Sequence, residues 1–423
     1  MVFRERASPF SEQLPMIGRT PEWERGLQAG SRRFKSQLSI HFLALLLIPP
    51  FLIVSCSHLT HAAEKPIKIG LLAPLTAREQ PPGKTLLEGA TLAIEQINRQ
   101  GGIRGAELKL IPKDDASDPA TGAQTLRELA QKEECVAIIG SPQTTVLMAS
   151  MPIANEEQIL LLAPNKANEI TQLGNKWLYR VGSYDQLTAA CITSFAVGEL
   201  KWRRIAILNQ KDEFGMEIVK DISRNMRKLG AALVGQATFD PGERDFTVPI
   251  GKILQKEPDG MVVWGPPAET ACIAQQLRQI GYRGVIIGSP DLRDAAYIEI
   301  SGPSGDHTVF PAPLTPANRR PMVSSFYADF QARFGYPPPS DLAASGYEAI
   351  MLLVKAMLTA KFIDRKAIRD SLSNIANYEL IQGLYTFKGS HGDGLRSLPI
   401  LIYLNRQQIP LNDQYRPDPR TSS

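Results

Sequence analysis

The same five residues occur twice in this chain, each time at the end of an apolar run. Ile-Ile-Gly-Ser-Pro ends an apolar run at 138–142 and again at 286–290. Thr144 follows the first copy and opens a predicted helix, whose first backbone N–H groups would suit an anion. Chance is the alternative explanation of the repeat, because such residues are common where strands end in turns.

Residue patterns that carry common catalytic chemistry are missing after residue 63. This part holds only two histidines, His307 and His391, and neither stands with a cysteine or carboxylate at the spacing of a metal site. It has no Gly-x-Ser-x-Gly elbow, no phosphate-binding loop and no Gly-x-Gly-x-x-Gly after its first strand. These absences favour a binding protein without metal or cofactor, and an enzyme that uses only carboxylates is the alternative.

Short apolar runs alternate with segments of helical spacing along most of the chain. Residues 67–74 predict a buried strand, and Leu87, Ala90 and Ile94 then recur at the spacing of a helix. The alternation restarts near residue 188, so we expect an α/β fold with two doubly wound parallel sheets. Ligands gather outside the carboxyl ends of such strands, so two sheets whose carboxyl ends face each other would form a ligand cleft.

The first part of the chain, residues 1–63, is expected to be an export signal and leader. Cationic residues at 32–35 precede an apolar run at 40–54, which two prolines interrupt and which is short for a membrane span. Residues 53–56 resemble a lipobox that would place a lipid on Cys56, and simple cleavage a few residues later is the alternative. The net charge of +4 comes mostly from this leader, so no nucleic-acid partner is predicted.

Several stretches resemble the branched-chain amino acid (Leu/Ile/Val) binding proteins, a family of periplasmic solute receptors with the type I periplasmic binding fold. Early matches are Leu-Thr-Ala after the first strand, "GATLAIEQIN", "GGIRG" and "DDASDP". Later matches are "LLAPNKANEIT", "DEFG", "PGERDFT" and "DLAASGYEAI". The resemblance therefore spans about residues 66–405.

The resemblance implies two lobes joined by a three-segment hinge, which trap a ligand when they close. It places lobe one at 66–182 and 311–383, lobe two at 183–310 and 384–410, and a disordered tail at 411–423. Such a protein is not an enzyme and needs no cofactor. It would lie in the periplasm as a monomer and deliver its small-molecule ligand to an inner-membrane ABC permease, and a ligand-sensing receptor of the same fold is the alternative.

In lobe one, the resemblance implies a ligand site at the loops that follow the strands. The family's hydroxyl for a ligand carboxylate falls on Thr144, between Gln143 and Thr145. The next family hydroxyl falls on Ala167 and is lost, with Asn165 and Lys166 adjacent to replace it. Capping of a helix is the alternative role for Thr144, and exposure to solvent is the alternative for Lys166.

In lobe two, the resemblance points to an aromatic residue at Phe214 and to Trp264 and Glu269 around a loop where relatives often carry aromatics. Asp291 is the candidate acid for a ligand amine, although it stands one position off. A core position is the alternative for Trp264, and helix capping is the alternative for the two acids. The full expected set is Gln143, Thr144, Thr145, Asn165, Lys166, Ala167, Phe214, Trp264, Glu269 and Asp291.

Two departures from the family bear on the ligand and on disulfides. Ser117 and Gln143 stand where many relatives carry a pair of disulfide-bonded cysteines, so the three cysteines at 135, 191 and 272 are expected to be unpaired. The lost hydroxyl at position 167 and the lysine beside it favour a carboxylate-bearing or amide-like ligand over leucine, isoleucine or valine.

Overall fold

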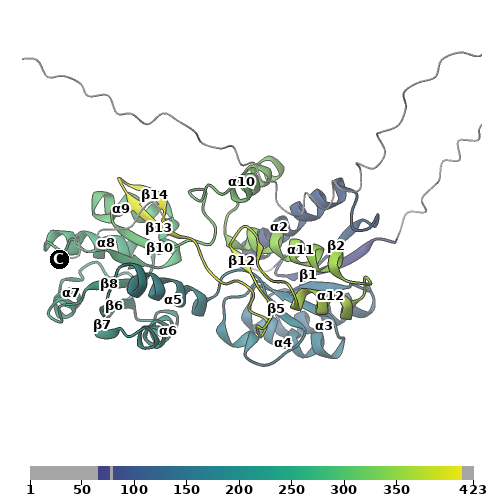
Figure 1. Cartoon of the computed structure of the whole chain (residues 1–423), viewed down its shortest axis with the longest axis horizontal. Coiled ribbons are helices and arrows are strands. Elements are labelled where there is room, and N and C mark those ends of the chain that lie inside the picture. The colour runs from purple at the N-terminus through teal and green to yellow at the C-terminus, as the bar shows by residue number, and fades with distance from the viewer. Residues whose placement is uncertain (1–64, 77–79, 412–423) are drawn as a thin grey trace, which may run out of the picture. The chain divides into compact units, whose positions relative to one another are not determined.

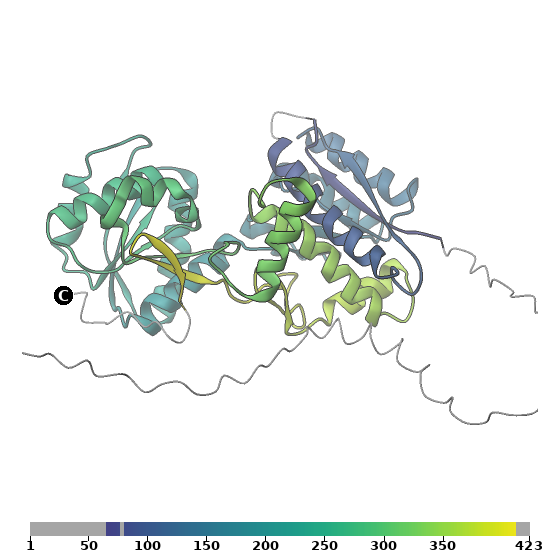
Figure 2. The same cartoon turned by 90° about the horizontal axis from the view of Figure 1, so that it is seen from above.

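The computed structural model describes residues 65–76 and 80–411, apart from the side chains of Gln80, Pro81, Glu213 and Phe214 (Figures 1 and 2). The predicted export signal with Cys56, and the tail after residue 411, lie outside the described residues.

The first sheet consists of parallel strands in the order β2-β1-β3-β4-β5. They are β1 (Ile67–Ala73), β2 (Leu108–Asp114), β3 (Ala137–Ile139), β4 (Leu160–Ala163) and β5 (Leu178–Arg180). The helices around this sheet are α2 (Gln80–Arg99), α3 (Pro119–Gln131), α4 (Thr144–Glu156), α10 (Pro321–Phe334), α11 (Asp341–Thr359) and α12 (Arg365–Ser373). Helices α2, α11 and α12 pack on one face and α3 and α4 on the other, so both faces are buried, as parallel sheets require. We call this sheet and its helices lobe one.

Helix α11 lies at the centre of lobe one. By length and composition it could cross a membrane, yet 72 % of its apolar window is buried in the protein, as in a core helix. It packs against α2 through two glycines. A Cβ atom at Gly89 would lie 1.9 Å from the carbonyl oxygen of Ala343, and one at Gly346 would lie 2.2 Å from that of Leu86. The close approach of the two backbones therefore depends on these glycines.

The second sheet has the order β14-β13-β10-β9-β8-β6-β7, with β13 antiparallel to both of its neighbours. Its strands are β6 (Arg204–Gln210), β7 (Ala232–Phe239), β8 (Gly260–Trp264), β9 (Ile286–Gly288), β10 (Thr308–Pro311), β13 (Ile400–Leu404) and β14 (Gln407–Pro410). Its helices are α5 (Asp185–Ser194), α6 (Glu213–Lys228), α7 (Thr247–Leu254), α8 (Pro267–Gln279) and α9 (Ala295–Ser301). Helices α5 and α6 cover one face and α7, α8 and α9 the other. We call this sheet and its helices lobe two, and the predicted α/β fold is confirmed.

The chain connects the two lobes three times. The first connection joins β5 to α5 at 181–184, the second joins β10 to α10 at 312–320, and the third runs from β12 (Leu384–Tyr385) to β13 at 386–399. Strand β12 pairs with β11 (Tyr378–Glu379) in a small separate hairpin. The loop that leaves β5 is itself the first connection, and the neighbouring parallel strands β4 and β3 end at the same edge of the sheet.

Candidate ligand-binding site

A cavity of about 550 Å³ lies at the carboxyl ends of the lobe one strands, and we call it the lobe one cavity. Its wall includes five of the residues expected from the sequence, namely Gln143, Thr144, Asn165, Lys166 and Ala167. Thr145 is exposed and is not among the lining residues. The loops after β3 and β4 are thus brought together as the topology predicts.

Asn165 connects, through hydrogen bonds, the two loops that form the wall of this cavity. Its side chain is only 2 % exposed, and its Nδ2 donates hydrogen bonds to Pro142 O (2.9 Å) and Thr144 Oγ1 (3.1 Å). Its Oδ1 accepts a hydrogen bond from Ala167 N (2.9 Å). Because the Thr144 oxygen accepts this bond, its own proton is left to donate to a ligand oxygen. Asn165 is therefore a positioning residue for the Thr144 hydroxyl.

Arg180, which the sequence analysis missed, is hydrogen-bonded to the same loop after β4. The residue is 1 % exposed at the end of β5, and its Nη1 donates to Asn165 O at 2.6 Å. Its Nε forms an ion pair with Asp393 at 2.7 Å, and its Nη2 donates to Thr171 Oγ1 at 3.3 Å. One buried cation thus ties the loop after β4 to the third connection between the lobes.

Asp185 is a lining residue of this cavity that the sequence analysis missed. It is the first residue of α5 and lies half-buried in the cavity wall. Burial raises the pKa of its carboxyl to about 6. The cations of Lys166 and Arg180 oppose this rise. Within the described part of the chain no group donates a hydrogen bond to this carboxylate, so it is available to a ligand.

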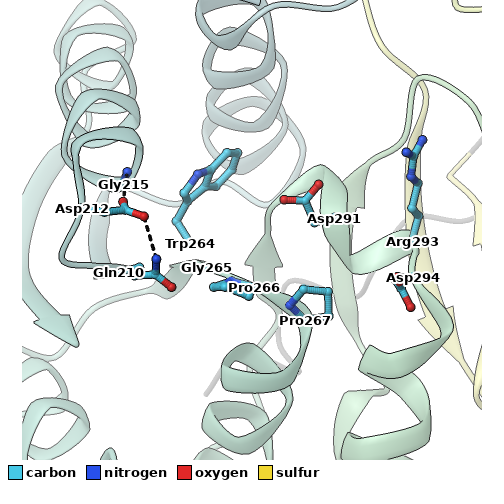
Figure 3. A pocket seen from close by; sticks show the side chains of 10 residues that line it. All are labelled: Gln210, Asp212, Gly215, Trp264, Gly265, Pro266, Pro267, Asp291, Arg293 and Asp294. Carbon is cyan, nitrogen blue, oxygen red and sulfur yellow. Dashed lines mark hydrogen bonds between the residues drawn. The ribbon is translucent and has the colours of Figure 1, made fainter. Parts of the chain in front are cut away.

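A second cavity, of about 360 Å³, lies at the carboxyl ends of β6, β8 and β9 in lobe two (Figure 3). Trp264, only 1 % exposed, and the exposed Asp291 both line it. Figure 3 shows Asp291 between Trp264 and Arg293. Arg293 also lines the lobe one cavity. Arg293 Nη1 contacts the carboxylate of Asp341 and donates to Leu314 O at 3.3 Å. An aromatic residue, an acid and a cation therefore line this cavity.

The other two expected residues of lobe two do not join that group. Glu269 lies in the first turn of α8, where its Oε1 accepts a hydrogen bond from Gly242 N at 3.1 Å. It lines neither of the two cavities. Phe214 lies in the first turn of α6, and its side chain is outside the described residues. Across the described ranges, no three His, Cys, Asp or Glu side chains lie close enough together to hold a metal ion.

Ser117 and Gln143 meet in space, as the resemblance implies for the positions of the family disulfide. Gln143 Nε2 donates a hydrogen bond to Ser117 Oγ at 3.1 Å. The three described cysteines are unpaired, as predicted. Burial raises the pKa of the Cys135 thiol to about 11, which makes it a poor nucleophile.

We expect the double substitution Ser117→Cys with Gln143→Cys to form a disulfide in an oxidising compartment. Closing this loop should stabilise the protein by roughly 3 kcal/mol, because it restricts the unfolded chain. Thiol titration and thermal unfolding, with and without reductant, measure both effects. Ser117→Cys alone is the control, and two reactive new thiols after oxidation would contradict the prediction.

Comparisons with known proteins agree with the fold described above. A family model described as "Periplasmic binding protein" matches residues 66–401. The Leu/Ile/Val-binding protein homolog 3 of Brucella melitensis is 25 % identical over 250 residues, which are 59 % of this chain and 68 % of that protein. The leucine-, isoleucine-, valine-, threonine- and alanine-binding protein of Pseudomonas aeruginosa is 24 % identical over 311 residues, 72 % of this chain and 82 % of that protein. The structure of an ABC transporter substrate-binding protein from Sphaerobacter thermophilus has a TM-score of 0.69 at 19 % identity and covers 82 % of this chain and 97 % of its own.

Proposed function

This chain belongs to the periplasmic binding protein family, and from that premise we propose that it serves an ABC importer by capturing an amino-acid-like, amide or carboxylate solute. Members of this family bind ligands in the periplasm and are not enzymes. The proposed mechanism is closure of the two lobes on the ligand, after which the inner-membrane permease recognises the closed form.

The hydrogen bond from Asn165 to Thr144 is the observation that best supports this ligand class. It leaves the Thr144 proton to donate into the lobe one cavity, at the first turn of the 13-residue helix α4. Backbone N–H groups at a helix start also favour a negative ligand group. A carboxylate or amide oxygen would satisfy both kinds of donor.

We assign to Asp185 the binding of a positively charged or N–H group of the ligand. This carboxylate lines the same cavity and lacks a hydrogen-bond donor within the described chain. An ammonium or amide N–H group of the ligand would supply that donor. Lys166, which is exposed on the rim, offers a second contact for a carboxylate in place of the hydroxyl lost at Ala167.

Native mass spectrometry of protein purified from its own periplasm tests the proposal, followed by identification of any released molecule. We expect one unmodified compound per chain that carries a carboxylate or an amide. If no compound is released and none of a panel of amino acids, amides and organic acids raises the melting temperature, the proposal is wrong. A compound found together with its breakdown product would also contradict it.

Uptake separates transport from sensing. Cells that lack this protein are expected to lose high-affinity uptake of the released compound. Unchanged uptake, with a lost transcriptional response to the compound, would favour the sensing receptor instead.

We further propose lipid attachment at Cys56. The intact mass of the exported protein tests this, because acyl groups would add to the mass.

We expect Asp185→Asn to weaken binding of an ammonium-bearing ligand by roughly 10- to 100-fold, because a charge-assisted hydrogen bond is lost. Calorimetry with the released compound and with its analogue lacking the amino group measures the effect. The analogue should bind the variant and the original protein about equally.

Glu169→Gln is the matched control for this prediction. It removes the same charge from an exposed residue that lines the same cavity, and it should change affinity little. If Asp185→Asn and the original protein bind the amine with equal affinity, Asp185 does not contact the ligand and the prediction is wrong.

A further inference from the structure

A third cavity, of about 790 Å³, lies at the opposite edge of the lobe one sheet from the ligand-binding loops. It is framed by the amino ends of β1 and β3, the loop at 103–106 and the turn at 361–363 between α11 and α12. None of these segments contributes to the lobe one cavity. A role for this surface is therefore separate from the proposed function.

Positive charge predominates around this cavity. Lys65, Lys68, Arg104 and Lys361 line it, against the single carboxylate of Glu134. Arg104 is held in place because its Nη2 donates to Met357 O at 3.1 Å, and Lys68 Nζ donates to Glu133 O at 3.0 Å. Carbonyl partners fix these cations without neutralising them, so the surface attracts anions.

Apolar side chains lie among these cations. Phe362, in the turn that follows α11, is 59 % exposed. Lys361 Nζ lies 5.2 Å from the centre of the Phe362 ring. The floor adds the apolar residues Ile103, Val136 and Ile363. An exposed ring framed by cations is typical of residues that enter the headgroup region of a bilayer.

We propose that this basic–apolar surface, formed by Lys65, Lys68, Arg104, Lys361 and Phe362, docks on an anionic lipid surface. The cations would bind lipid phosphates, and Phe362 would enter the boundary between headgroups and acyl chains.

The order of residues along the chain supports this partner. Lys65 follows Cys56 by nine residues, which extend over at most about 30 Å. A lipid on Cys56 would therefore hold the surface within reach of the bilayer. Acyl anchors commonly act together with a basic patch, because each adds to a membrane affinity that neither supplies alone.

Hydrogen exchange of the exported protein with vesicles tests the proposal, because local protection reports contact at this surface whether or not Cys56 carries a lipid. The vesicles are phosphatidylcholine alone or mixed with phosphatidylglycerol. We expect amides at 101–106 and 360–364 to exchange about tenfold more slowly with the anionic vesicles, and high salt should weaken this protection. Neutral vesicles should give little protection.

Two matched variants sharpen the test. The triple variant Lys65→Gln, Lys361→Gln, Phe362→Ser should lose the protection. The control Arg227→Gln, Lys228→Gln, Leu229→Ser removes two cations and an apolar residue, 45 % exposed, from the end of α6 and should keep it. Equal protection on both vesicle types, or unchanged protection in the first variant, would overturn the proposal. If glycerol 3-phosphate alone gives the same protection, the cavity binds a free phosphate, and this result would also overturn the proposal.

Discussion

Replacing Arg180 by methionine is expected to lower the free energy of unfolding by about 3 kcal/mol. The guanidinium is 1 % exposed and bonds to Asp393, Thr171 and the carbonyl oxygen of Asn165. Methionine has a similar length but leaves these partners without their donor. Asp393 stays 25 % exposed, so water compensates it in part and the loss lies at the low end for a broken buried ion pair. Calorimetric unfolding of the purified protein measures the change.

Arg333→Met is the matched control. Arg333 forms an ion pair with Glu95 at 2.8 Å, but both side chains are more than a third exposed, so the same substitution should cost less than about 1 kcal/mol. The combination of Arg180→Met with Asp393→Leu should recover part of the loss, because it removes both charges together. Equal destabilisation at positions 180 and 333 would show that burial of the ion pair is irrelevant.

The same variant links stability to binding. Arg180 holds the carbonyl group of Asn165, and Asn165 in turn orients the Thr144 hydroxyl. Weaker support of this loop should lower ligand affinity even at temperatures where the protein is folded. Arg333→Met should leave affinity unchanged, since neither Arg333 nor Glu95 lines the lobe one cavity or the cavity of lobe two.

Local sequence signals located most elements of the fold. Asp118 and Pro119 illustrate why: the carboxylate of Asp118 accepts a hydrogen bond from Thr121 N at 2.7 Å, and α3 begins at Pro119. Such caps and apolar runs depend only on neighbouring residues. The two Ile-Ile-Gly-Ser-Pro copies likewise end β3 and β9, where the loops that line the two cavities begin.

Short elements of lobe two carry weaker signals. Strand β14 has only four residues, Gln407–Pro410, and forms because it pairs with β13 across a two-residue turn. Helix α9 has seven residues and depends on the Asp294 cap, whose side chain accepts from Ala296 N. Tertiary pairing, more than propensity, decides such segments.

The residues missed at the site owe their roles to distant partners. Arg180 sits in an apolar strand, and its ion-pair partner Asp393 follows 213 residues later. Arg293 reaches Asp341 in the same way, from a short helical turn to the start of α11. An arginine inside an otherwise apolar strand was the one local signal available. No spacing rule predicts which distant carboxylate it will meet.

Glu348 is expected to make the stability of this protein fall as pH rises. Its carboxyl is fully buried, and burial raises its pKa from the ordinary 4.5 to about 7. The folded state therefore holds this proton more tightly than the unfolded state does. The stabilisation is complete below about pH 4.5 and is lost as pH rises through about 7. The loss should be on the order of 1–3 kcal/mol.

The contacts of Glu348 place this titration at the connections between the lobes. Its carboxylate accepts hydrogen bonds from Gln382 N (2.6 Å) and Tyr385 Oη (2.6 Å). Tyr385 Oη accepts one from Gly182 N (2.9 Å) in the first connection. Arg320, at the end of the second connection, partly offsets the rise in pKa by its charge. Ionisation of one side chain thus affects contacts that reach two of the three connections between the lobes.

Glu348→Gln tests this dependence, because glutamine has nearly the same shape and does not titrate. Its amide must donate where the carboxylate accepted from Tyr385, so the variant is expected to be somewhat less stable than the original protein at low pH. The informative quantity is the difference in melting temperature between the two proteins, which should shift in favour of the variant from about pH 5 to about pH 8.

Glu95→Gln is the control, because the pKa of Glu95 is shifted in the opposite direction to that of Glu348. The hydrogen bond from Arg333 lowers the pKa of Glu95, so this variant should lose a small stabilisation at neutral pH and none in acid. Asp185, whose pKa is about 6, contributes a second fall in stability at lower pH that both proteins share. Subtracting the two melting curves removes it. A difference that stays constant from acid to neutral pH would show that Glu348 keeps one charge state in the folded protein.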